Sequence, residues 1–162
     1  MRVEVVFGHL CVALGMLLLL SQLRRWRWVF ALAVWPGTVA HEALHFGVGA
    51  LFGARPISFS VWPRKMSDGS LLLGFVQFAR LRWWNKLPVA LAPLGLLPCS
   101  AYLVWMALAV PLLSVGGCAL KLLAAQLVLG AFPSGQDWRH AIIGAVSAGC
   151  LLLLVVWFAA RC

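Results

Sequence analysis

The sequence predicts an all-α polytopic membrane protein with about five transmembrane helices and a small membrane-associated β-hairpin between the second and the third. Hydrophobic residues make up 64% of the 162 positions, which is more apolar surface than a water-soluble domain of this length can bury. The thirteen Lys and Arg residues give a net charge of +9 and gather in short clusters between the apolar runs. Such clusters are typical of side chains at a membrane interface.

Five apolar runs qualify as candidate spans, because one crossing takes roughly 20 residues. The first run follows a basic Arg2 and resembles a signal peptide, but no small-residue cleavage site follows it, so we expect a retained span. The last two runs form one apolar region that a polar break at 133–140 interrupts. We expect a single membrane-embedded domain over residues 1–162. The runs cover residues 3–21, 28–52, 87–113, 118–132 and 141–160.

The segment between the second and third apolar runs differs from the rest of the chain. Residues 56–62 alternate apolar and small polar side chains, which is the period of a β-strand. Residues 70–80 are rich in Leu, Phe and Val, and Ser67-Asp68-Gly69-Ser70 before them is a turn signal. We therefore expect a β-hairpin over residues 56–80. An amphipathic interfacial helix is the alternative, but two prolines and the alternation disfavour it.

The positions of Lys and Arg predict the side of the membrane on which each loop lies. With a cytoplasmic N-terminus and five crossings, eight basic residues fall inside and five outside. The excess inside favours this orientation, in which the hairpin lies on the cytoplasmic side of the cell (inner) membrane. Nucleic-acid binding is another explanation of a basic chain, but it requires a solvated basic face. We therefore expect the chain to lie in a lipid bilayer and not to bind nucleic acid.

An H-E-x-x-H motif, His41-Glu42-Ala43-Leu44-His45, lies inside the second apolar run. With so few acidic residues and histidines in the chain, its chance occurrence is on the order of one in a thousand. Ionisable residues in an apolar span are costly and mark functional sites. Residues four apart share one face of a helix, so His41 and His45 direct their imidazoles at one point. That geometry suits Zn²⁺, with Glu42 as the general base acting on water.

A catalytic zinc takes a third protein ligand besides the two histidines. We expect Asp137, at the break after Pro133, because irregular backbone is tolerated in a membrane where it lines a buried site. We expect Asp68 to be a turn residue and His9 to be a histidine that is bonded to a neighbouring helix. His140 shares a helix face with Asp137 and is either a partner of the site or an interfacial residue.

The segment 41–62 resembles the site-2 protease family, the intramembrane zinc metalloproteases. His41-Glu42-x-x-His45-Phe46 is followed by Leu51-Phe52-Gly53 and then by Phe59-Ser60. This order is similar to the family's motif helix, its small-residue end and its entry into a β-hairpin. Leu44 stands where the family often has Gly.

A second segment is similar to the one that supplies the family's third ligand. The family takes an Asp from a Pro-containing Leu-Asp-Gly segment of a later span, and Pro133-x-x-x-Asp137 has the same character. Gln136 replaces the Leu, and Trp138-Arg139 replace the glycines. The site residues that the resemblance implies are the zinc ligands His41, His45 and Asp137 and the catalytic Glu42.

The resemblance implies a zinc-dependent endopeptidase that hydrolyses peptide bonds in or near transmembrane segments of partner membrane proteins. Because helical peptide bonds are shielded, a substrate must unwind, and the hairpin edge at Phe59 and Val61 is a candidate for holding it by strand addition. The alternative is a non-catalytic membrane protein with a structural or regulatory metal site. A small transporter is disfavoured, because the polar residues are too few and too clustered to line a pore.

Overall fold

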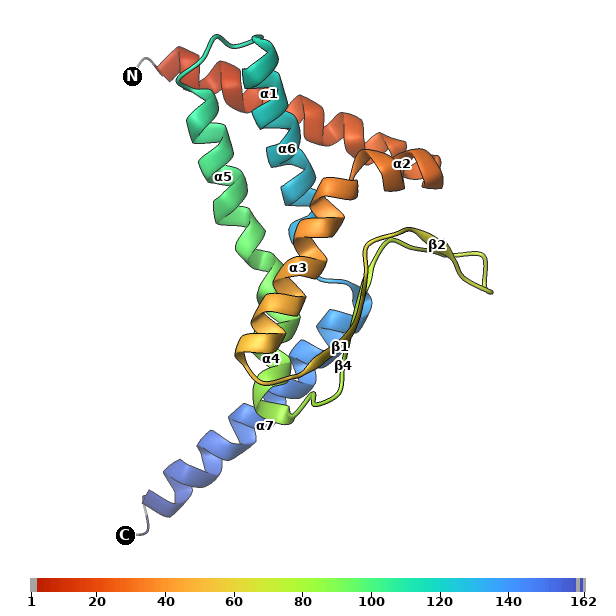
Figure 1. Cartoon of the computed structure of the whole chain (residues 1–162). Helices are drawn as coiled ribbons and strands as arrows, with labels where there is room; N and C mark the ends of the chain where they lie inside the picture. The colour runs from red at the N-terminus through yellow and green to blue at the C-terminus, as the bar shows by residue number, and fades with distance from the viewer. Residues whose placement is uncertain (1–2, 160, 162) are drawn as a thin grey trace.

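The computed structural model describes residues 3–159 and 161, and most of them are helical (Figure 1). The helices before the hairpin are α1 (Val3–Gln22), the short 3₁₀ helix η1 (Leu23–Arg25), α2 (Arg27–Ala33) and α3 (Trp35–Leu51). The strands are β1 (Pro56–Ser60), β2 (Arg64–Lys65), β3 (Leu71–Leu72) and β4 (Phe75–Phe78). After them come α4 (Trp83–Leu91), the 3₁₀ helix η2 (Ala92–Gly95), α5 (Leu96–Ala107), α6 (Val115–Ala131) and α7 (Gly135–Ala159).

Helix α6 is the centre of the packing. It contacts α1, α3 and α5, and α4 packs against α7. Figure 1 shows α3 and α5 running alongside α6, while α1 lies across it near the N-terminus. The hairpin stands beside α3, and α7 leads away to a C-terminus at the other end of the molecule from the N-terminus. The motif helix α3 therefore lies between α6 and the hairpin.

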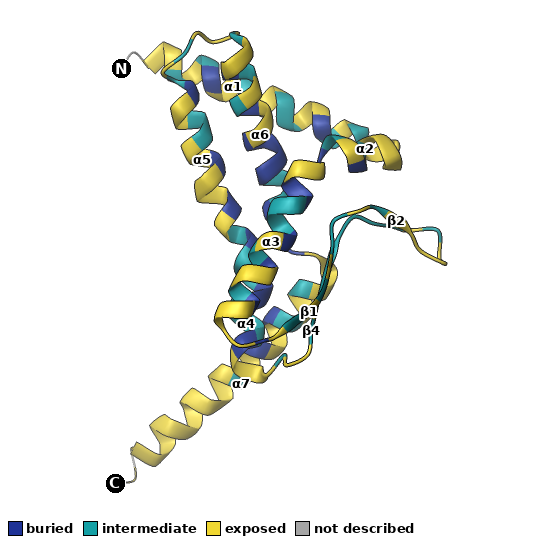
Figure 2. Cartoon of the chain, viewed as in Figure 1, coloured by how far each residue is buried: buried dark blue, intermediate teal, exposed yellow. Residues whose placement is uncertain are grey.

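Figure 2 shows that much of the helix surface is exposed and that the buried residues lie mainly where helices meet. Polar side chains are among the buried residues, and many large apolar side chains are exposed. His9, Asn85 and Lys121 are each at most 1% exposed. Large apolar side chains cover the outer faces of the helices, and residues 151–158 of α7 are all exposed. Because so large an apolar surface is unfavourable in water and favourable in lipid, these helices are those of a membrane protein.

Three helical segments among the described residues are long and apolar enough to cross a membrane, so the expected five spans are not supported. They are Val3–Arg25, Trp83–Ala107 and Gly135–Ala159, of 23, 25 and 25 residues. The expected 118–132 span is α6, which has only 17 residues. A helix of that length falls short of the roughly 20 residues that a crossing takes.

The expected span at 28–52 is two helices, α2 and α3, which meet at Val34. Pro36 lies in the first turn of α3. Because its nitrogen carries no hydrogen, it cannot continue the hydrogen-bond ladder of α2. The amide Nε2 of Gln126 in α6 donates to the carbonyl oxygen of Ala33 beside this break, at 2.7 Å. Hydropathy alone does not show the break, since both helices are apolar.

The third and last expected spans shift at their ends. The expected 87–113 span becomes α4, η2 and α5, and Pro93 lies where the helix changes to 3₁₀ geometry. The last span, expected at 141–160, already begins at Gly135, and Ala160 lies outside the described residues. The polar break is therefore shorter than predicted, and Asp137 belongs to the first turn of α7.

The β-hairpin is confirmed between α3 and α4. Strand β1 pairs with β4 and β2 with β3, both antiparallel. At the tip, Oδ1 of Asp68 accepts hydrogen bonds from the backbone N–H and the hydroxyl of Ser70, at 2.8 and 2.6 Å. These hydrogen bonds, the hydroxyl's first, lower the pKa of the Asp68 carboxyl. Gly69 has φ +78°, which favours glycine, so the predicted turn chemistry is present.

Glycine residues allow the close approach of α3 and α6. A Cβ atom on Gly130 would lie 2.6 Å from the carbonyl oxygen of Gly37, and one on Gly37 would collide with the backbone of Gln126. Small residues let two helix backbones approach in this way inside a membrane. The contact brings the end of α6 against the helix that carries His41.

Replacing Gly130 by Ala is expected to lower the free energy of unfolding by about 1–3 kcal/mol, because the new methyl group forces the helices apart. Unfolding in detergent micelles measures this change. Gly47→Ala is the control, since nothing lies within 4 Å of a Cβ there. It should leave stability equal or slightly raised. Equal stability of Gly130→Ala and the control would contradict the proposed contact.

Candidate metal centre

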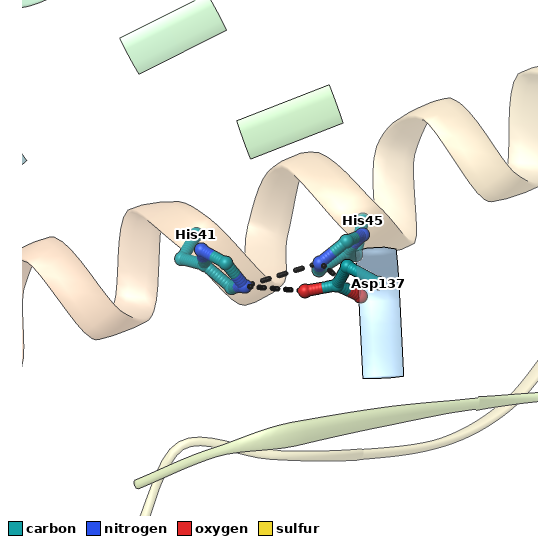
Figure 3. Close-up of side chains that lie close together, drawn as sticks. All are labelled: His41, His45 and Asp137. Carbon is teal, nitrogen blue, oxygen red and sulfur yellow. Dashed lines mark hydrogen bonds and ion pairs between the residues drawn. The ribbon is translucent and has the colours of Figure 1, made fainter. Parts of the chain in front are cut away.

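Two imidazoles and one carboxylate converge at the junction of α3 and α7 (Figure 3). His41 and His45 lie one turn apart on α3, and their Nε2 atoms are 3.1 Å apart. The Asp137 carboxylate lies 3.7 Å from Nε2 of His41 and 3.3 Å from Nε2 of His45. The predicted residues are therefore brought together from two elements far apart in the chain.

A backbone carbonyl holds each imidazole from behind. Nδ1 of His41 lies 2.6 Å from the carbonyl oxygen of Gly130, and Nδ1 of His45 lies 2.8 Å from that of Val89. Since a carbonyl only accepts, each Nδ1 carries the proton of its ring. In a neutral imidazole this leaves Nε2 as a lone pair directed at the site. Both histidines thus have the tautomer that suits a metal ligand.

Proline and helix ends explain why these carbonyls can accept. Gly130 lies in the last turn of α6, whose carbonyls have no donor four residues further along the same helix. For Val89 that donor would belong to Pro93, which has no N–H, so only the tighter 3₁₀ bond from Ala92 reaches this oxygen. The second lone pair of the Val89 carbonyl is left for His45. The same irregularities that end the helices therefore orient the ligands.

The positions of the three side chains fit a metal ion. In neutral imidazoles with protonated Nδ1 atoms, two Nε2 lone pairs at 3.1 Å beside a carboxylate repel one another unless a proton or a metal cation lies between them. A tetrahedral ion with bonds of about 2.0–2.1 Å holds its ligand atoms about 3.3 Å apart, close to the distances observed here. The ligand atoms of His41, His45 and Asp137 all lie within 4.8 Å of one another, so the cluster could hold a metal ion.

A capping box at the start of α7 fixes Asp137. The backbone N–H of Ser134 donates to Oδ2 of Asp137 at 2.7 Å. In return, the N–H of Asp137 donates to the hydroxyl oxygen of Ser134 at 3.3 Å. Reciprocal bonds of this kind satisfy two donors at a helix start and hold both side chains. Asp137 therefore points back at α3 with its second oxygen directed at His45.

Glu42 lies beside the ligands and is 7% exposed. Its carboxylate packs against Gly74 in the hairpin, where a Cβ would lie 2.7 Å from Cγ of Glu42. Two cavities meet at Glu42. The first cavity, of about 450 Å³, lies between α3, β4, α4 and the start of α7. The second cavity, of about 410 Å³, lies between α2, α3, the hairpin and the end of α6.

The other candidate ligands lie elsewhere or face the site without joining it. Nδ1 of His9 is 3.3 Å from Nζ of Lys121 in α6, which confirms the prediction of a histidine bonded to a neighbouring helix. Asp68 is at the hairpin tip. His140 lines the first cavity, and its buried Nδ1 has no hydrogen-bond partner among the described residues. It therefore belongs to the cavity wall and is not one of the three clustered ligands.

The residues expected to hold a substrate, Phe59 and Val61, contact α3 and do not line the cavities. The ring of Phe59 packs edge-on against Phe46 of α3, with 5.9 Å between centroids. The carbonyl of Val61 accepts a hydrogen bond from Nε1 of Trp35 at 3.0 Å. Neither residue lines the first or the second cavity. Residues 74–78, at and within β4, line the first cavity, so β4 borders the metal centre more closely than Phe59 and Val61 do.

Several contributors to the site were missed in the sequence. Val89 and Gly130 act through their carbonyls, which carry no residue-type signal. Pro93 indicates the free carbonyl of Val89, because a proline has no N–H to bond the carbonyl four residues earlier. Gly74 and Lys86 reach the cavity only through folding of the hairpin and α4 against α3.

Comparisons of the chain with models of known protein families, with curated proteins and with solved structures gave no match. Function therefore has to be inferred from the site itself.

The purified protein is expected to bind one divalent metal ion per chain. Replacing His41, His45 or Asp137 by Ala should weaken binding by more than about 100-fold, since even partners of ligands contribute 10- to 100-fold. Metal analysis and titration of each variant in detergent measure this. Asp68→Asn removes a carboxylate outside the site and should bind as the wild type does. Full affinity in Asp137→Ala would exclude its role as a ligand.

Proposed function

We propose that this chain is an intramembrane zinc-dependent endopeptidase that hydrolyses peptide bonds in or near transmembrane segments of partner proteins. The observation that carries the proposal is the convergence of two metal-ready imidazoles and one carboxylate at a cavity, with Glu42 adjoining. The resemblance of residues 41–62 to site-2 proteases agrees with it.

The donor set favours zinc in a catalytic role. Imidazole nitrogens and a carboxylate oxygen are donors that zinc accepts, and three protein ligands leave one coordination position open. Structural zinc sites are normally closed by four protein ligands. Among the described residues only three side chains cluster here, and they border a cavity. These features support hydrolysis over a non-catalytic metal site.

Each residue then has a defined task. Bound zinc would supply a Lewis acid that polarises the scissile carbonyl and acidifies water. Glu42 takes the proton from the attacking water and passes it to the leaving nitrogen. His41 and His45 keep their orientation because their Nδ1 protons are held by carbonyls. Burial of Glu42 limits access of bulk water and strengthens electrostatic interactions within the site.

The hairpin provides a place for an unwound substrate. In its two-stranded sheet, β4 pairs with β1 alone, so its outer edge has unpaired backbone groups. This strand also borders the first cavity. An extended segment added to the β4 edge would pass beside the metal ligands. The proposed substrate strand therefore lies along β4 and not at Phe59 and Val61.

The distribution of Lys and Arg supports one side of the membrane for the metal centre. The segment between α3 and α4, which forms the hairpin, carries five of the basic residues, and Lys86 follows at the start of α4. Because an excess of Lys and Arg favours the cytoplasmic side, we propose that the hairpin and the metal centre lie on the cytoplasmic side of the cell inner membrane. The five residues of the segment are Arg55, Arg64, Lys65, Arg80 and Arg82.

Glu42→Gln is expected to retain zinc and fold while cleavage falls by about 10²–10⁴-fold, because the amide cannot take up the proton. Mass spectrometry of membrane proteins co-expressed with each variant measures cleavage, and metal analysis measures zinc. Asp68→Asn serves as the control with unchanged cleavage. Wild-type turnover in Glu42→Gln would falsify the assignment of the base.

Gly74→Ala tests the position of Glu42 without changing the carboxylate. The new methyl group would lie 2.7 Å from Cγ and 2.9 Å from Oε1 of Glu42, so the side chain must move. Cleavage should fall about tenfold or more with zinc retained, since small misplacements of catalytic groups are costly. Gly116→Ala is the control, because no atom lies within 4 Å of a Cβ there. Unchanged cleavage in Gly74→Ala would contradict this role of the hairpin.

A further inference from the structure

The two cavities that meet at Glu42 differ in chemistry. Most residues that line the second cavity are apolar, and they come from α2, the α2–α3 junction, the hairpin and the end of α6. They include Phe30, Val34, Leu71, Leu72, Leu129 and Phe132, while Arg24 and Thr38 add polar groups to this wall. The first cavity also has apolar residues, but Gln77, Lys86, Gln136 and His140 line it and not the second cavity. A chain that passes the metal centre would therefore meet a more apolar wall on one side and a more polar wall on the other.

Lys86 is the one Lys or Arg on the wall of the first cavity. The acids on that wall are Glu42 and Asp137, which belong to the metal centre. No carboxylate lies within 4.0 Å of the Lys86 ammonium among the described residues, where the only contacts of that length between a carboxylate and a basic side chain join Asp137 to the histidines. Lys86, which is half-buried, thus has no anionic partner within the described chain.

The position of Lys86 in its helix also does not account for its charge. It lies in the first turn of α4, where the helix dipole disfavours a cation. No acidic residue occupies that turn to offset it. The positive end of the helix dipole therefore adds to the charge of Lys86 and does not offset it. The combined positive potential attracts a carboxylate supplied from outside the chain.

We propose that Lys86 selects substrate segments with an Asp or Glu on one side of the scissile bond and apolar residues on the other. The acidic side chain pairs with Lys86 in the first cavity, while the apolar residues occupy the second. This rests on the proposed function, because it assumes that the substrate crosses the metal centre. It adds a sequence preference, which places cleavage where an apolar run meets an acidic residue.

Short peptide hydroxamates test the preference without needing turnover, because the hydroxamate is a zinc chelator. Two series of probes are made, and their peptide extends from opposite sides of the hydroxamate. Every peptide consists of leucines and one variable position, which carries Glu, Gln or Lys. Binding is measured with the zinc-loaded full-length chain in detergent micelles. In one series the wild type should bind the Glu probe about five- to tenfold more tightly than the Gln probe, and the Lys probe least tightly.

Variants of Lys86 separate its charge from its role in the fold. Lys86→Gln should bring the affinities for the Glu and Gln probes together, and Lys86→Glu should make the Lys probe the tightest. Lys65→Glu makes the same charge change at an exposed position of β2 that lines neither cavity, and it should keep the wild-type order.

The outcomes distinguish this inference from the function on which it rests. Equal affinity of the wild type for all probes, or an unchanged order in Lys86→Glu, would overturn the role of Lys86 and leave the protease proposal intact. Failure of every hydroxamate to bind would contradict the proposed metal centre, and both proposals would then fall.

Discussion

The structure depends on the convergence of two imidazole Nε2 atoms, 3.1 Å apart on α3, with the carboxylate of Asp137. With both imidazoles neutral and their protons on Nδ1, two lone pairs and a carboxylate would repel one another in a medium of low dielectric constant. A metal cation at their common point would turn this repulsion into coordination. The rest of the fold supports this point, since α6 and α4 supply the carbonyls behind the rings and α7 supplies Asp137.

Breaks in regular structure are used to build the centre. The ends of α6 and of α4 each leave a carbonyl able to accept from a histidine, and the start of α7 is capped by the aspartate that joins them. Irregular backbone is costly in a bilayer unless its polar groups find partners inside the protein. Here the proposed metal ligands are those partners: His41 and His45 bond to the carbonyls of Gly130 and Val89, and Asp137 accepts from the N–H of Ser134. The helix breaks and the metal centre therefore stabilise each other, although they are distant in the sequence.

Buried polar groups inside an apolar exterior allow the chain to keep such a site within a membrane protein. Ionisable groups in lipid are costly, and the described chain keeps its site residues buried or half-buried between α3, α7 and the hairpin. The hairpin has a second consequence, because Gly74 lets it lie directly against Glu42. A strand with an unpaired edge thus borders the residue proposed to be the base. Lys86 adds the unpaired positive charge that gives the first cavity its own chemistry.

Local patterns were sufficient to predict the membrane class, the hairpin with its turn at Asp68, and the pairing of His41 with His45, because each depends on neighbours in the sequence. The expected five spans are not supported, since Pro36 divides one apolar run without changing its hydropathy and α6 has only 17 residues. Asp137 was predicted as a ligand, but its capped position in α7 was not. Only the tertiary structure decided which carbonyls orient the imidazoles and which strand faces the cavity, because those contacts join segments that have no common local pattern.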